Sequence, residues 1–276
     1  DIIGSFRSSS PNIDHQQGLR GEYFDSRKFS KGSRVLERTD PRIDFSFGTK
    51  SPVPEQINPD RFSIRWEGSV IPPETGRYEF IIRTDQAVRV FVNADDAQKP
   101  LIDATVRSGD EQEYRAIRTL LGGRAVPLRI EFSKGRQGVA KQGQDDQDAQ
   151  AFIKLLWRPP YGVVEVIPER CLSPATSPEV YVLPTSFPPD DASLGYERGS
   201  RVSQEWLAAT TAAAIDTADY CLEHAEELAR IERNAPDRKK KLEDFAALFA
   251  EKAFRSPLSE ELRMQIVSNS FSAAPN

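Results

Sequence analysis

The sequence predicts a mainly β protein followed by α-helices: an antiparallel β-sandwich, a proline-rich connector and a partial C-terminal helical bundle. Three patterns predict this order. Apolar and polar residues alternate along residues 62–92, prolines crowd residues 158–200, and apolar residues recur every three or four positions from Ser203 onward. We therefore expect three parts: a sandwich at 1–160, a connector at 161–200 and a helical domain at 201–276.

The clearest strand pattern starts at Phe62. Phe62, Ile64 and Trp66 share one face, because successive side chains of a strand point to opposite sides. A Pro-Pro-Glu-Thr-Gly turn leads to a second alternating strand at 78–83, and a polar corner at 84–87 leads to a third at 88–92. Trp66 falls on the apolar side of its strand, as Trp157 does in a later one, so we expect both tryptophans in the core.

The connector is predicted from its prolines, and the helices are predicted from their N-cap residues and from the spacing of apolar residues. Eight prolines between residues 158 and 200 prevent regular helix, although short apolar runs at 163–167 and 180–183 are suited to edge strands. Ser203 is the expected N-cap of a long helix, a second helix follows Pro236, and the Ser256-Pro257 step starts a third. The long helix carries one apolar stripe, formed by Ala208, Thr211, Ile215, Ala218, Leu222, Ala225 and Ala229.

The β part resembles the protective-antigen-fourteen domain family. The resemblance covers about residues 15 to 160, and its elements occur in the family's order. It rests on Gly18 to Phe24, Trp66-Glu67-Gly68, Pro73, Gly76, Tyr78, Phe80, Asp85, Val90 to Asn93, Leu101 to Asp103, Leu120 to Gly123, Leu128 to Phe132 and Ala151 to Trp157. The resemblance implies a β-sandwich that recognises carbohydrate and is carried by adhesins, glycosidases and toxins.

In calcium-dependent members of this family, two adjacent aspartates at the polar corner hold the metal, which in turn holds two sugar hydroxyls. Here Asp85 matches the first aspartate, while Gln86 replaces the second and Ala87 replaces the usual glycine. Calcium prefers six to eight hard oxygen ligands, and the loss of one carboxylate weakens the site. We name Asp85 as the metal ligand of a feeble calcium site; the alternative is that Asp85 only caps the turn.

Two further acidic segments hold candidate ligand-binding residues. We include Asn93 and Asp95 with Asp85 and Gln86 as ligand-binding residues, although the strand between them separates the two pairs unless the corner loops curl over the end of the sandwich. The insertion at 134–150 holds Asp145, Asp146 and Asp148; its composition is typical of a solvated loop. Among the aromatic residues, Tyr23, Tyr114 and Tyr161 remain candidate platforms for a sugar ring.

Composition excludes several classes. The net charge of −5 comes from 37 basic and 42 acidic residues spread along the chain, so no basic face predicts nucleic-acid binding. Cys171 and Cys221 form neither a disulfide framework nor a CxxCH haem site, so we expect no haem. No apolar run approaches a membrane span. With only His15 and His224 available, no nucleophilic triad or histidine-rich zinc site is indicated, and we predict no enzyme activity.

The C-terminal part resembles the helical domains of unknown function of planctomycete-type proteins that carry c-type cytochrome modules. The resemblance rests on Ser186 to Asp191, Gly195 to Gly199, Val202-Ser203, Trp206, Ala209 to Thr211 and Ala253 to Leu258. The familiar form has two basic residues before the Pro-Leu pair, whereas this chain has Arg255 and Ser256. The resemblance implies a multidomain parent protein, and the absence of an initiator methionine before Asp1 also predicts a piece of a longer chain.

These observations lead to one expected function and two alternatives. We expect a non-catalytic glycan-binding module of a larger extracytoplasmic protein, periplasmic, cell-surface or secreted. It would contact a glycan or polysaccharide and the other domains of its parent, with neither nucleic acid nor membrane insertion involved. The first alternative is a structural or docking module that positions the helical domain. The second makes the helical part a component of an electron-transfer enzyme.

Overall fold

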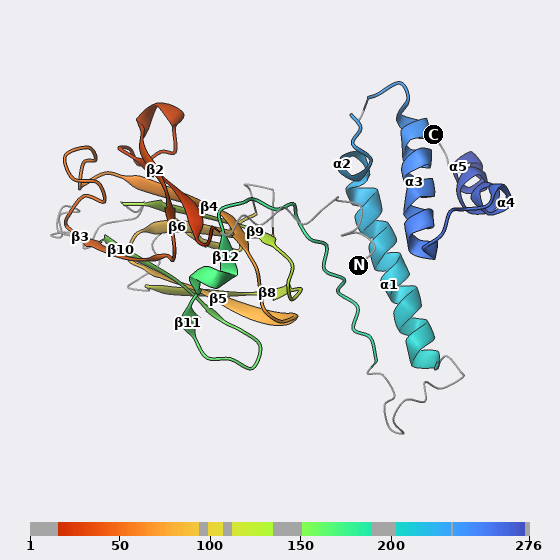
Figure 1. Ribbon diagram of the computed structural model, residues 1–276, viewed down its shortest axis with the longest axis horizontal. Coiled ribbons are helices and arrows are strands. Elements are labelled where there is room, and N and C mark those ends of the chain that lie inside the picture. The colour runs from red at the N-terminus through yellow and green to blue at the C-terminus, as the bar shows by residue number, and fades with distance from the viewer. Residues whose placement is uncertain are drawn as a thin grey trace. The chain divides into compact units, whose positions relative to one another are not determined.

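The chain forms two compact units in a computed structural model that describes residues 16–93, 99–106, 112–134, 151–188, 203–232 and 234–273 (Figure 1). Within these ranges, a β unit ends at Val182 and a helical unit begins at Leu183. Two antiparallel sheets are followed by helices, so the predicted fold class is confirmed.

The larger sheet of the β unit has seven described strands. Its order is β2-β1-β4-β9-β6-β7, and β12 adds to one end of β4. These strands pair antiparallel to one another. The strands are β1 (Leu19–Phe24), β2 (Arg34–Asp40), β4 (Ser63–Val70), β6 (Ala87–Val92), β7 (Ile102–Ala104), β9 (Val126–Ser133) and β12 (Leu172–Ser173), with a short 3-10 turn η1 (Lys31–Ser33) before β2.

The second sheet has five described strands in the order β11-β10-β5-β8, with β3 paired to β10. It faces the first sheet across a shared apolar core, as expected of a sandwich (Figure 1). The strands are β3 (Asp44–Gly48), β5 (Gly76–Thr84), β8 (Glu113–Leu120), β10 (Ala151–Arg158) and β11 (Glu165–Val166), and the 3-10 turn η3 (Glu169–Cys171) precedes β12.

The alternating pattern explains the core. Phe62, Ile64 and Trp66 are fully buried between the sheets, while Arg65 and Glu67 of the same strand point outward and remain partly exposed. Trp66 is 0% and Trp157 1% exposed, which confirms both as core residues. The Trp66 ring packs against Phe132 at 6.4 Å and stacks on Phe45 at 5.7 Å between ring centroids.

The first half of the proline-rich segment packs on the sandwich. Glu165 and Val166 pair with Trp157 and Leu156 of β10, and Leu172 and Ser173 pair with Val70 and Ser69 of β4. These short additions bury Ile167 and Leu172, which are 1% and 2% exposed. The apolar run 163–167 therefore adds a short strand to the sandwich, as its pattern suggested. The β unit accordingly extends to Val182.

The helices are α1 (Gln204–Glu223), α2 (Ala225–Ala229), α3 (Arg238–Phe254), α4 (Glu260–Arg263) and α5 (Asn269–Ala273), with a π-helical segment η4 (Met264–Ser268) between the last two. The Ser203 hydroxyl accepts a hydrogen bond from the Trp206 N–H at 3.1 Å, which confirms the predicted N-cap. The third predicted helix starts later than the Ser256-Pro257 step, because Ser259 accepts from the Leu262 N–H and provides the cap.

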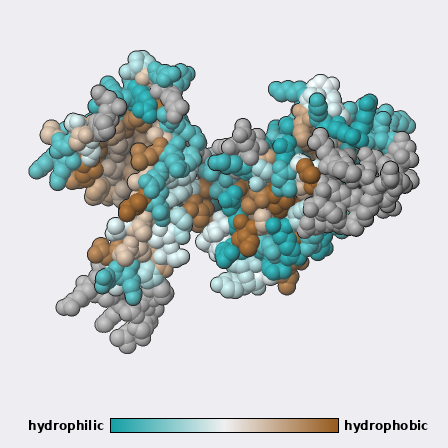
Figure 2. Space-filling view, turned by 180° about the vertical axis from the view of Figure 1, so that it is seen from behind, coloured by the Kyte–Doolittle hydropathy of each residue, from teal (hydrophilic) through white to brown (hydrophobic). Residues whose placement is uncertain are grey.

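The predicted apolar stripe of α1 faces solvent. Ile215 and Leu222 are 57% and 76% exposed, whereas the opposite side of the helix buries Ala213. Trp206 packs against Phe187 of the connector at 5.4 Å between ring centroids, and Thr185 hydrogen-bonds to Asp216. Brown, apolar side chains are accordingly visible on the surface of the helical unit in Figure 2.

Candidate functional site

The two ends of the sandwich carry different loops. Cross-strand pairs Phe24–Ser63, Ser63–Ser133 and Ala87–Ser133 place the ends or beginnings of β1, β4, β9 and β6 together. We call this the corner end, because it holds the Asp85-Gln86 corner; its described connecting residues are 25–33, 49–62, 85–86, 105–106, 112 and 134. The opposite end, the turn end, holds the described connecting residues 41–43, 71–75, 93, 99–101, 121–125 and 159–164.

The longest described connection of the β unit, 49–62, belongs to the corner end. Binding residues concentrate on loops that a rigid scaffold positions, so this end is the candidate site. The described loops are tied to one another. The Asn58 N–H donates to the Asp25 carboxylate at 2.8 Å, and the Ser133 hydroxyl donates to the Arg27 carbonyl at 3.2 Å.

The polar corner itself is held by hydrogen bonds to β5 and β10. The Gln86 N–H donates to the Thr84 hydroxyl at 3.0 Å, and this hydroxyl donates to the Phe152 carbonyl at 2.7 Å. Gln86 is only 3% exposed, while Asp85 is partly exposed. Of this pair, Asp85 is therefore the residue with exposed surface, although its Oδ1 atom is buried.

Lys134 is a site residue that the sequence analysis did not single out. Ala87 of β6 pairs with Ser133 of β9. Because the two strands are antiparallel, the residue before Ala87, Gln86, comes opposite the residue after Ser133, Lys134. Lys134 is 2% exposed, and its ammonium donates to the Pro59 carbonyl at 2.7 Å. The alternation of β9 could have indicated its burial, because Lys134 follows Leu128, Ile130 and Phe132 at intervals of two residues and these three side chains point inward.

The structure separates Asn93 from this corner. Asn93 follows the far end of β6, at the turn end, with a φ of 55°. Its side-chain amide donates to the Val180 carbonyl at 2.6 Å, and its side-chain oxygen accepts from the Val180 N–H at 2.7 Å. Asn93 thus fastens the connector to the sandwich. Asp95 and the acidic segment 145–148 lie outside the described residues.

The candidate aromatic platforms differ in exposure. Tyr23 is fully buried and Tyr114 is half-buried, whereas Tyr161 is completely exposed. Tyr161 has a φ of 59° in a turn closed by the Gly162 N–H and the Pro159 carbonyl at 3.1 Å. This turn belongs to the turn end, so Tyr161 does not join Asp85.

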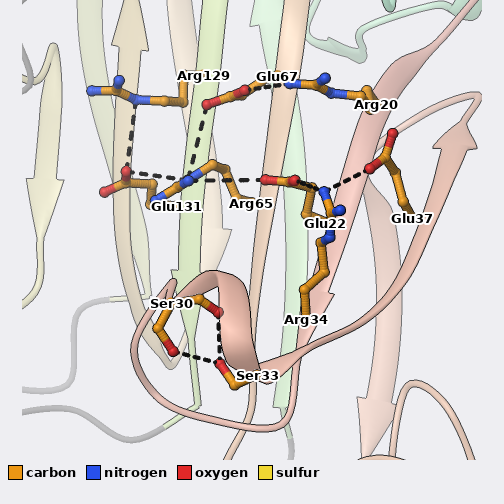
Figure 3. Close-up of polar contacts among 10 residues, drawn as sticks. All are labelled: Arg20, Glu22, Ser30, Ser33, Arg34, Glu37, Arg65, Glu67, Arg129 and Glu131. Atoms are coloured by element: carbon orange, nitrogen blue, oxygen red, sulfur yellow. Dashed lines mark hydrogen bonds and ion pairs between the residues drawn. The ribbon is translucent and has the colours of Figure 1, made fainter.

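The outer face of the seven-stranded sheet is charged but compensated (Figure 3). Glu131, 9% exposed, lies 2.8 Å from Arg89, 3.6 Å from Arg65 and 3.7 Å from Arg129. Similar pairs run from Arg20 to Glu67 and from Arg34 to Glu37. A shallow cavity of about 160 Å³ beside this face is lined by Glu67, Gly68, Pro127, Leu128, Arg129, Thr176 and Ser177.

Across the described ranges, no three His, Cys, Asp or Glu side chains gather in a way that would hold a metal ion. In the same part of the chain, every helix is too short or too polar to cross a bilayer.

The fold and the corner end define a β-sandwich that presents its longest described loop, 49–62, at the same end as the Asp85-Gln86 corner. A match to the PA14 domain family covers residues 15–167, more than half of the sequence, and the chain belongs to this family. The expected resemblance is confirmed.

Relatives of this chain include the anti-sigma-I factor RsgI3 of Acetivibrio thermocellus, which is 31% identical over 161 residues. That alignment covers 58% of this chain and 22% of RsgI3, so the chain spans about a fifth of the relative.

Solved structures with similarity include the epithelial adhesin 9 A domain of Candida glabrata in complex with Galb1-3GlcNAc. It is 12% identical with a TM-score of 0.46, and the match covers 60% of this chain and 92% of that domain. The PA14 domain of the antifreeze protein MpAFP is 15% identical with a TM-score of 0.43, over 62% of this chain and 96% of that one.

Proposed function

We propose that this chain is a non-catalytic carbohydrate-binding module of a larger extracytoplasmic protein, and that it binds glycan with the corner end of its sandwich. Membership of the PA14 domain family supports the proposal, together with one observation: the longest described loop, 49–62, lies at the same end of the sandwich as Asp85, whose corner is hydrogen-bonded to β5 and β10. The polysaccharides of cell walls and cell surfaces lie outside the cytoplasm, and this is the reason for the proposed location.

The corner end offers the polar groups that sugar hydroxyls require. Beside the partly exposed carboxylate of Asp85, the 49–62 loop exposes the amide of Asn58, the carboxylate of Asp60 and the guanidinium of Arg61. Planar groups of this kind donate and accept paired hydrogen bonds, so they can recognise neighbouring hydroxyls of one ring. The bond from the Asn58 N–H to Asp25 limits the ordering cost of binding.

A glycan array with and without added calcium tests the proposal. We expect binding to at least one polysaccharide class, and a loss of about tenfold or more in Asp85→Ala, because a charged hydrogen bond contributes on the order of 1.5–3 kcal/mol. Glu74→Ala is the matched control, since Glu74 is an exposed carboxylate of the turn end. Equal losses in both variants, or no binding to any glycan, would contradict the proposal.

A second candidate is a docking module that positions the helical unit among other domains, for example in a cytochrome-associated parent protein. The observation that favours it is the exposure of large apolar side chains on α1: Ile215 and Leu222 of the stripe are 57% and 76% exposed, and Leu207 nearby in sequence is 61% exposed. A silent glycan array, combined with weaker association with the parent's other domains in Ile215→Lys, would favour this candidate.

A further inference from the structure

The ammonium of Lys134 is buried, and the described part of the chain supplies no counterion for it. The side chain is 2% exposed, and among the described residues its ammonium has a single hydrogen-bond acceptor, the Pro59 carbonyl, and no carboxylate partner. An ammonium carries three donors, and burying such a charge costs free energy unless it is paired. The burial of Lys134 therefore costs free energy, and the residues around it indicate its role.

Those surroundings form the corner where a calcium ion would have to bind. Gln86 lies opposite Lys134 across the β6 and β9 ladder, and both side chains are buried on the inward side. Calcium requires six to eight oxygen ligands, and its affinity rises with the number of anionic ones. Among the described residues, this corner offers one carboxylate, from Asp85, one neutral amide, from Gln86, and the positive charge of Lys134, and this donor set does not fit calcium.

We infer that Lys134 is the resident cation of the corner end, taking the place that a divalent metal would need, and that this corner binds sugar hydroxyls without metal. This inference rests on the proposed glycan-binding function. Lys134 acts as a positioning residue. Its bond to Pro59 holds the 49–62 loop across the corner, and the loop's exposed groups then contact the ligand directly.

Calorimetric titration with calcium chloride tests the inference on four proteins that span residues 1–276: the native chain, Gln86→Asp, Lys134→Met and Gln86→Asp/Lys134→Met. We expect no measurable binding by the native chain and at most feeble binding by either single variant. In Gln86→Asp, the added carboxylate would pair with Lys134. The double variant should bind calcium at least about tenfold more tightly than Gln86→Asp, because it gains a carboxylate and loses the opposing cation.

Tight calcium binding by the native chain would overturn the inference, and so would a double variant no tighter than Gln86→Asp. Melting temperatures confirm that each protein is folded, and Lys134→Gln replaces Lys134→Met if the methionine variant is not. Gln86→Asp/Lys134→Arg is the conservative control, since it keeps the cation and should remain unable to bind calcium. A native chain that binds no glycan while the calcium results hold would overturn the proposed function alone.

Discussion

The two units differ in how completely they bury their apolar residues. The sandwich encloses a continuous core that includes Trp66, Phe132 and Trp157, each at most 1% exposed. In the helical unit, the buried apolar residues of the described chain are Ala213, Ile231, Ala247, Ala250 and Val267. Large side chains such as Leu222 and Phe254 are exposed there instead. Burial of apolar area is the main stabilising contribution, so the sandwich should be stable alone and the helices marginal.

This difference teaches where each unit draws its stability. The strands of the sandwich are joined by pairs that are distant in sequence, such as Ser69 with Ser173, and the core closes within residues 16–182. The helices have good local signals, including the N-caps Ser203 and Ser259. Local signals alone do not stabilise a helix much, because most helical stability in proteins comes from packing.

Shortening the β unit should have the largest effect on this comparison. A fragment of residues 9–182 is expected to melt cooperatively, whereas a fragment that ends at Pro160 should lose about 5 kcal/mol or more, because Ile167, Cys171 and Leu172 each contribute roughly 1.5–3 kcal/mol by burial. Urea unfolding of both fragments measures the difference. Equal stabilities would show that the segment after Pro160 is not part of the sandwich.

A core substitution in each unit sharpens the contrast. Trp66→Ala should lower the free energy of unfolding of the β unit by about 3–5 kcal/mol, because it empties a fully buried site and leaves Asp40 without the indole N–H that donates at 2.7 Å. Val267→Ala, in the helical unit, should cost about 1 kcal/mol. Denaturant titrations with probes for each unit decide this, and a costlier Val267→Ala would reverse the comparison.

Asn93 allows a test of the fastening between connector and sandwich. Asn93→Gly keeps the left-handed φ of 55° but removes two hydrogen bonds to Val180, for an expected cost of about 1–3 kcal/mol. Asn93→Ala should cost about 1 kcal/mol more, since alanine disfavours that φ. If both variants unfolded in urea like the native chain, the connector would not be fastened here.

The sandwich should also lose stability at high pH through Tyr23. Burial, and then the charge and hydrogen bond of Asp40, raise the pKa of Tyr23 above its ordinary value of 10.0, while Arg38 acts in the opposite direction. The folded state therefore keeps the proton when the unfolded state loses it. Above pH 10, the free energy of unfolding should fall by about 1.4 kcal/mol per pH unit from this group.

Comparison with Tyr23→Phe isolates this effect. The variant removes the phenol, so its unfolding free energy should fall less steeply above pH 10 than that of the native chain. It will be less stable at pH 7, because Asp40 loses the hydroxyl that donates at 2.6 Å. Parallel slopes for the two proteins would assign the alkaline loss of stability to other groups.

Much of this architecture could be predicted from the sequence, because alternation and caps are local signals. The burial of Trp66 and Trp157 and the cap at Ser203 follow from them. Lys134 was missed because its charge suggests a surface position, although its phase in the strand points inward. The exposed apolar stripe of α1 shows a second limit of prediction from sequence. The spacing of apolar residues indicates that the helix has an apolar face, but it does not say which element covers that face.

The central claim is that the corner end of the sandwich binds glycan, and separating the units tests it most directly. Residues 9–182, residues 183–276 and the full chain are compared on the polysaccharides found by the array, each with a melting curve. We predict that the β unit binds with a dissociation constant within about twofold of the full chain, and that the helical unit does not bind. Glycan binding that disappeared from a folded β unit, or persisted in the helical unit, would contradict the account.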